Sequence, residues 1–170
     1  NEKAEAVNIY QQYTKIYPED LTSQIFLARL LTVLNRTEEA EPIIDNLIKI
    51  YDNHMLLNQL KGVARLHAKD NKNALLYTEK AILQNPKDAA LRLVAAYSAY
   101  QLKNCEASYN HLSVIADKIP TTHPAFRLLA ICQVNLGLGV EASETLSLIN
   151  EVSTQDAGLF SMVSLALINQ

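Results

Sequence analysis

The side chains that could support catalysis are scattered along this sequence and belong to no catalytic motif. The chain lacks the phosphate-binding patterns GxxxxGK and GxGxxG, the zinc-protease pattern HExxH and the nucleophile pattern GxSxG. No two of its four histidines have the i, i+4 spacing of paired metal ligands: His54, His67, His111 and His123. The run Gly137-Leu138-Gly139 is interpreted as a turn between helices. We therefore expect a non-enzymatic protein with no cofactor and no metal site.

The two cysteines, Cys105 and Cys132, are the remaining reactive side chains. They stand 27 residues apart and form no CxxC pattern. Free cysteine commonly behaves as a small apolar residue inside proteins. We expect two free, partly buried thiols, with a disulfide between them as the alternative.

The elements that carry these residues repeat along the chain with a period of 34 residues. Steps of this length from Ala6 meet a small residue every time: Ala40, Ala74, Ser108 and Ala142. Steps from Ala28 do the same: Gly62, Ala96, Ala130 and Ser164. Where two helices cross closely, a larger side chain would hold their backbones apart. The two columns therefore predict one close helix crossing in each repeat.

Prolines mark the ends of the second helices. Pro18, Pro86 and Pro120 share one column of the repeat, and proline disfavours helical geometry in the residue before it. Apolar spacing then predicts first helices over 21–34, 54–68, 89–102, 123–136 and 156–169. It predicts second helices over 2–16, 38–50, 72–83, 105–117 and 140–149.

These columns resemble the tetratricopeptide repeat (TPR), with its small residues at repeat positions 8 and 20 and its proline at position 32. The resemblance covers essentially the whole chain. It implies an all-α, right-handed superhelical solenoid of antiparallel helix hairpins. The expected organisation is one domain, cut from a longer array, with repeats at 21–54, 55–88, 89–122 and 123–156 and partial repeats at 1–20 and 157–170. Lys61 replaces the usual leucine, and Asn58 replaces the usual aromatic residue, which predicts either looser packing in the middle repeats or a local bend of the superhelix.

The resemblance also implies that the first helices line a concave groove for a partner. The groove positions fall on twelve residues: Ile25, Arg29, Gln59, Val63, Leu66, His67, Leu93, Tyr97, Tyr100, Arg127, Ile131 and Val134. Aromatic and arginine side chains are typical anchors of protein interfaces. We expect an extended or helical apolar peptide to lie over Tyr97 and Tyr100, with Arg29 and Arg127 available for a carboxylate or for backbone carbonyls. The alternative is that curvature of the solenoid buries these side chains against one another.

Composition limits the classes of partner. The 15 basic and 18 acidic residues give a net charge of −3 without any charged run, which argues against nucleic acid. No apolar stretch approaches the roughly 18 residues of a membrane span, so we expect no membrane insertion. The last predicted helix, 156–169, is apolar on several sides, and we expect self-association through it. A protein or peptide partner remains the leading expectation. A structural spacer, or a regulatory arm of a larger protein, is the alternative.

A narrower resemblance concerns two stretches, 57–65 followed by 74–81 and 123–130 followed by 136–139. They are similar to repeats of bacterial TPR lipoproteins of the PEP-CTERM and exosortase system. This similarity implies a lipoprotein in the bacterial periplasm or outer membrane, with a role in exopolysaccharide production or protein sorting. Without it, a cytoplasmic location is expected.

Overall fold

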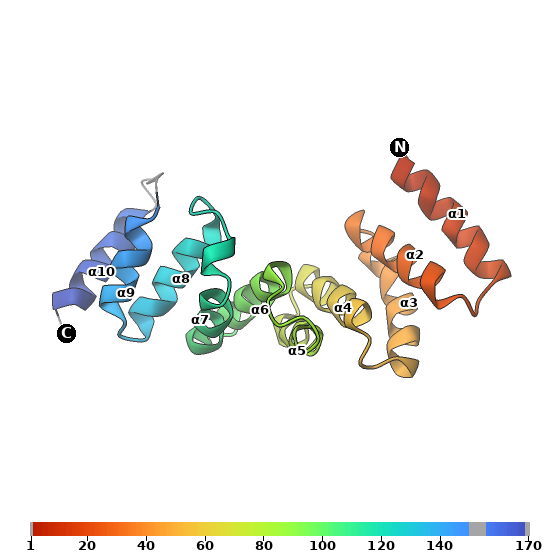
Figure 1. Cartoon of the computed structure of the whole chain (residues 1–170). Coiled ribbons are helices and arrows are strands. Elements are labelled where there is room, and N and C mark those ends of the chain that lie inside the picture. The colour runs from red at the N-terminus through yellow and green to blue at the C-terminus, as the bar shows by residue number, and fades with distance from the viewer. Residues whose placement is uncertain (1, 150–155, 169–170) are drawn as a thin grey trace. The chain divides into compact units, whose positions relative to one another are not determined.

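The chain folds into consecutive antiparallel helices, seen in a computed structural model that describes residues 2–149 and 156–168 (Figure 1). The described residues contain no strand. Their α-helices are α1 (Glu2–Ile16), α2 (Leu21–Val33), α3 (Thr37–Ile50), α4 (Met55–His67), α5 (Asn71–Ile82), α6 (Ala89–Gln101), α7 (Cys105–Ser113), α8 (Pro124–Asn135), α9 (Gly139–Ser147) and α10 (Ala157–Ile168). A short 3₁₀ helix, η1, spans Ala116–Lys118. The predicted all-α fold of helix hairpins is therefore confirmed.

One predicted helix is divided. The sequence predicts a single helix over 105–117, but α7 ends at Ser113 and η1 follows it. The backbone switches there to tighter i−3 hydrogen bonds, with Ile115 N–H donating to Leu112 O at 3.0 Å and Lys118 N–H donating to Ile115 O at 2.9 Å. This path buries both Ile115 and Ile119 in the core, so packing overrides the helical pattern.

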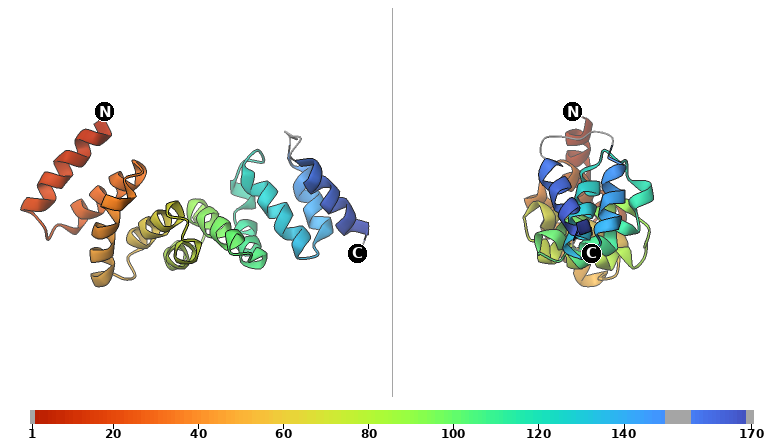
Figure 2. Two further views of the ribbon diagram at one scale, coloured as in Figure 1. Left: turned by 180° about the vertical axis from the view of Figure 1, so that it is seen from behind. Right: turned by 90° about the vertical axis from the view of Figure 1, so that its left-hand side faces the viewer.

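The helices gather into two compact units, an N-terminal unit (Asn1–Pro86) and a C-terminal unit (Lys87–Gln170). The boundary lies two residues before the predicted repeat boundary at 88/89. Within the N-terminal unit, α2 pairs with α3 and α4 pairs with α5; within the C-terminal unit, α6 pairs with α7 and α8 pairs with α9. This succession of hairpins can be followed from behind in Figure 2.

The small residues of the repeat lie where helices cross. Ala40, Ala74, Ser108 and Ala142 are all completely buried, as are Ala28, Ala96 and Ala130. A Cβ atom added to Gly62 would lie 2.4 Å from Thr78 Oγ1, which shows how closely α4 approaches α5. The predicted reason for the two columns is therefore confirmed for these eight residues. The end members of the columns differ, because Ala6 is only half-buried and Ser164 is exposed.

Each unit has its own apolar core. In the N-terminal unit the core includes Val7, Leu31, Ile44 and Leu57. In the C-terminal unit it includes Leu112, Phe126, Leu146, Leu159 and Val163, so α10 closes the core against α8 and α9. Burial of these side chains supplies most of the free energy that holds neighbouring helices together.

Side-chain caps fix where several helices begin. The carboxylates of Asp20, Asp70 and Asp88 and the amide oxygen of Asn104 each accept a backbone N–H in the first turn of the following helix. Hydrogen bonds from Ser23 to Asp20, and from Asn73 to Asp70, hold the pKa values of these two carboxyls below the ordinary value.

The expectation of loose packing is wrong for the repeat at 55–88. The contact between α4 and α5 is the most extensive between any two helices of the described residues. Asn58 is buried, and its amide donates to Asp52 O at 2.7 Å and to His54 O at 3.1 Å, so it ties down the preceding turn. Lys61 is also buried and pairs with Asp45 Oδ1 at 2.5 Å. Polar side chains with partners replace the expected apolar ones without opening the structure.

Candidate partner-binding site

An apolar pocket of about 350 Å³ opens in the C-terminal unit. Its walls come from α6 and α8, and Leu112 of α7 also lines it. α6 and α8 approach each other less closely than α2 and α4 do, which leaves the space between them. The lining side chains are Leu93, Tyr97, Tyr100, Leu112, His123, Pro124, Ala125, Arg127, Leu128 and Ile131.

Helical spacing places the two walls. Leu93, Tyr97 and Tyr100 are separated by four and three residues, so they share one face of α6. On α8, Arg127 and Ile131 are four residues apart and face the same pocket. The start of α8 is fixed by His123, whose Nδ1 accepts the Ala125 N–H at 3.1 Å, and by Pro124 in the first turn. Both walls are therefore rigid helical elements.

Arg127 is already engaged by an internal carboxylate. Its Nε lies 2.5 Å from Asp156 Oδ1, and its Nη2 lies 2.9 Å from Oδ2, so the pair is bidentate. Asp156 is buried and immediately precedes α10. The sequence predicted that this guanidinium would be available to a partner's carboxylate, and the structure shows it paired within the chain. The pocket is thus lined by apolar surface and a neutralised cation.

Five of the twelve predicted groove residues meet in this pocket: Leu93, Tyr97, Tyr100, Arg127 and Ile131. Val134, on the same helix, packs against the core of the C-terminal unit and does not line the pocket. The other six belong to the N-terminal unit. Among them Ile25 is buried in the core, Gln59, Val63 and Leu66 are half-buried, and Arg29 and His67 are exposed.

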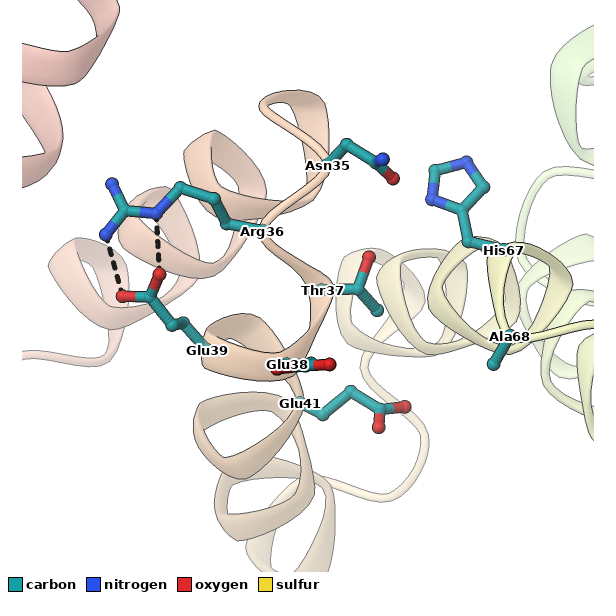
Figure 3. Close-up of a pocket in the computed structure, with 8 residues that line it drawn as sticks. All are labelled: Asn35, Arg36, Thr37, Glu38, Glu39, Glu41, His67 and Ala68. Atoms are coloured by element: carbon teal, nitrogen blue, oxygen red, sulfur yellow. Dashed lines mark hydrogen bonds and ion pairs between the residues drawn. The ribbon is translucent and has the colours of Figure 1, made fainter.

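His67 lines a different, polar pocket of about 480 Å³ in the N-terminal unit. Figure 3 shows its ring, from α4, opposite Asn35. In the same pocket Arg36 and Glu39 form a bidentate pair at 2.6 and 2.7 Å, which lowers the pKa of Glu39. Glu38 and Glu41 add further carboxylates. This surface offers no apolar anchor point and differs in chemistry from the pocket of the C-terminal unit.

Sequence reasoning missed several lining residues. Leu112 lies on a second helix, whereas the resemblance assigns the groove to the first helices. His123 begins the predicted helix over 123–136 and is the N-cap residue of α8, but it was not assigned to the groove. Across the described part of the chain, no three His, Cys, Asp or Glu side chains are grouped so that they could hold a metal ion. None of the described helices is long and apolar enough to cross a membrane.

Solved structures with the same fold are TPR proteins. YrrB, described as a TPR protein with an unusual peptide-binding site, superposes with a TM-score of 0.80 at 18% identity, covering 94% of this chain and 82% of its own. MamA from Desulfovibrio magneticus RS-1 gives 0.73 at 18% identity, covering 100% and 88%. A thermophilic TPR protein of Thermus thermophilus gives 0.58 at 19% identity, covering 98% and 91%. No protein-family model and no curated protein sequence matches the chain. The chain therefore has the TPR fold.

Proposed function

We propose that this chain is a non-enzymatic interaction scaffold that binds a polypeptide segment through the apolar pocket of the C-terminal unit. The observation that carries the proposal is the meeting of Leu93, Tyr97, Tyr100 and Ile131 around one preformed cavity. A large apolar side chain of the partner enters this cavity as an anchor, and the tyrosine rings contact the neighbouring backbone.

The size and chemistry of the pocket support a peptide anchor. At about 350 Å³ the cavity is at the small end of ligand pockets, which typically span roughly 300–1,000 Å³. Interface hot spots are enriched in tyrosine and are surrounded by residues that exclude water. Since Arg127 is neutralised by Asp156, an uncharged anchor side chain loses little on entering.

The fold supports the same assignment. TPR solenoids present rigid helices whose side chains can be varied without changing the backbone, and this arrangement suits recognition of an extended or helical segment. YrrB is described as having a peptide-binding site, and this chain shares its fold at 18% identity. The similarity supports a peptide as the class of ligand but does not indicate the sequence of that peptide.

A selection from a random peptide library on the immobilised chain tests the proposal. Selected peptides should share an aromatic or branched aliphatic residue, and the Tyr97→Ala, Tyr100→Ala double variant should bind them at least about tenfold more weakly because it removes the anchor contacts. Fluorescence anisotropy with the labelled peptides measures the affinities.

Tyr51→Ala is the matched control, because Tyr51 in the N-terminal unit is exposed to a similar extent, 42% against 47% for Tyr97. It should bind the peptides as the wild type does. Equal affinity of the wild type and the double variant, with the helical content of both unchanged, would rule out this pocket as the binding site.

The narrower function is an envelope protein of the PEP-CTERM and exosortase system, as the stretches at 57–65 and 123–130 suggest. In this role the scaffold would hold a component of exopolysaccharide production or protein sorting at a lipid-anchored site. The coding sequence upstream of residue 1 tests the idea. It should encode a signal peptide followed directly by a cysteine for lipid attachment, and a start codon followed directly by a repeat would contradict the idea.

A further inference from the structure

The two cysteines, distant in sequence, are brought together by the packing of α7 against α8. Cys105 is the first residue of α7, and Cys132 lies in the middle of α8. Asn135, one helical turn after Cys132, donates from its Nδ2 to Cys105 Sγ at 3.4 Å. Residues three apart share one face of a helix, so Cys105 lies over the face of α8 that carries Cys132.

The environments of the two thiols differ. Cys132 is completely buried, with an exposed fraction of 0%, and small molecules have no direct access to it. Burial, followed by a hydrogen bond with the Cys105 thiol, raises the pKa of Cys132 to about 12. Cys105 is only partly buried, and it lines a polar surface pocket of about 560 Å³ with Lys103, Asn104 and Glu106. A reagent that enters this pocket meets Cys105 first.

We propose that Cys105 is a modification site for small-molecule disulfides and that Cys132 resolves the adduct to give a reversible Cys105–Cys132 disulfide. In the first step the Cys105 thiolate attacks one sulfur of the reagent, RSSR, and a thiolate RS⁻ leaves and takes up the proton that Cys105 released. In the second step the Cys132 thiolate attacks Cys105 Sγ, and the second RS⁻ leaves and takes up the Cys132 proton. Two protein thiols are oxidised, and one RSSR is reduced to two RSH.

The environment of Cys132 sets the rate of the second step. Only a small fraction of a thiol with a pKa of about 12 is ionised near neutral pH. Resolution is therefore slow at pH 7 and accelerates by about tenfold for each pH unit over the range in which the protein stays folded. The mixed disulfide at Cys105 accumulates transiently at the lower pH.

Incubation of the whole chain with oxidised glutathione, followed by alkylation and mass spectrometry, tests the proposal. The wild type should lose both thiols and finish without bound glutathione, and dithiothreitol should restore both. Cys132→Ser should retain one glutathione on Cys105, because nothing resolves the adduct. Cys105→Ser should leave Cys132 unmodified in the folded chain. Circular dichroism verifies folding, and Cys132→Ala, which keeps the buried position apolar, replaces the serine variant if that variant unfolds.

Two results would overturn the assignment. One is a wild-type chain that keeps glutathione on Cys105 indefinitely, even at pH 9, since it would show that Cys132 cannot reach the adduct. The other is modification of Cys132 in Cys105→Ser at the wild-type rate, since it would show that Cys105 is not the point of entry.

Discussion

Gly62, in the repeat at 55–88, lies so close to α5 that a Cβ atom has no room at this position. Its α-carbon faces Thr78, whose hydroxyl donates to Ala74 O at 2.7 Å and is buried in the crossing of α4 and α5. The equivalent positions in the other repeats carry alanine or serine. At Gly62 itself, the approach of α4 and α5 leaves no room for a Cβ atom.

Gly62→Ala should destabilise the chain. The new Cβ would lie 2.4 Å from Thr78 Oγ1 and 3.2 Å from the Thr78 backbone nitrogen, so the helices must separate. Overpacking of this kind costs about 1–3 kcal/mol, offset by the better helix propensity of alanine, about 1 kcal/mol. The urea midpoint measures the difference.

Gly158→Ala on α10 is the control for this substitution, because nothing lies within 4 Å of its added Cβ. It should leave the midpoint unchanged or raise it slightly. If Gly62→Ala matches this control, the close approach of α4 and α5 does not constrain residue 62.

Each turn between the two helices of a hairpin contains one residue in the left-handed backbone conformation. Its residue type indicates this conformation in only some of the repeats. Asn35, Lys69, Lys103 and Gly137 have φ values of 58°, 58°, 62° and 75°, and they are spaced by one repeat period. Asparagine and glycine are common in this conformation, but lysine is not. The two lysines therefore hold a strained backbone that the surrounding hairpin enforces.

Lys103→Gly should stabilise the chain by up to about 1 kcal/mol, and Gly137→Ala should destabilise it by a similar amount, because a Cβ atom disfavours positive φ. No atom lies within 4 Å of a Cβ added to Gly137, so the effect there comes from the backbone alone. Thermal and urea unfolding measure both changes. Lys103→Ala keeps a Cβ atom and should be as stable as the wild type. If Lys103→Ala were stabilised as much as Lys103→Gly, the lysine side chain and not the positive φ would be the cause.

Among the helices, α10 is distinguished by its apolar outer surface. It carries no charged residue between Ala157 and Ile168. Leu159 and Val163 enter the core of the C-terminal unit, whereas Phe160, Met162, Leu165, Leu167 and Ile168 are exposed. Apolar patches of this kind commonly mark contact surfaces. Self-association through this helix is therefore our prediction for the chain in solution.

The Leu165→Glu, Ile168→Glu double variant should weaken self-association by more than about tenfold, since like charges would face each other across the contact. Its folding stability should change little, because both side chains are strongly exposed. Sedimentation equilibrium over a range of concentrations measures the association. Leu83→Glu, at a comparably exposed leucine in the N-terminal unit, is the control. A monomeric wild type at the highest concentration would contradict the prediction.

At the scale of the whole molecule, a purely structural spacer is the competing role for a repeat protein. A spacer depends on the number of repeats, whereas a binding scaffold depends on one pocket. Because each repeat contacts mainly its neighbours, one period can be removed without changing the others.

Deletion of residues 21–54 should preserve peptide binding within about twofold, since every residue of the apolar pocket lies in the C-terminal unit. Asp20 would then precede α4 at a helix start where His54 provides no side-chain cap. Circular dichroism measures the helical content per residue, and anisotropy measures the affinity for selected peptides. In the cell, a spacer role predicts that this deletion abolishes function although peptide binding is retained. A binding role predicts that the deletion preserves function and that the Tyr97→Ala, Tyr100→Ala variant, which keeps every repeat, abolishes it.

The sequence by itself determined the all-α class, the helix order and most helix ends of this chain, through the period of small residues and prolines together with the apolar spacing. Helix crossings demand small residues at fixed intervals, and this demand is local enough to be visible in the sequence. Tertiary structure alone decided that Arg127 is paired with Asp156, that Leu112 lines the pocket and that Cys105 lies over the face of α8 that carries Cys132. Each of these contacts joins different helices, and their separation and rotation depend on the packing of all the side chains between them.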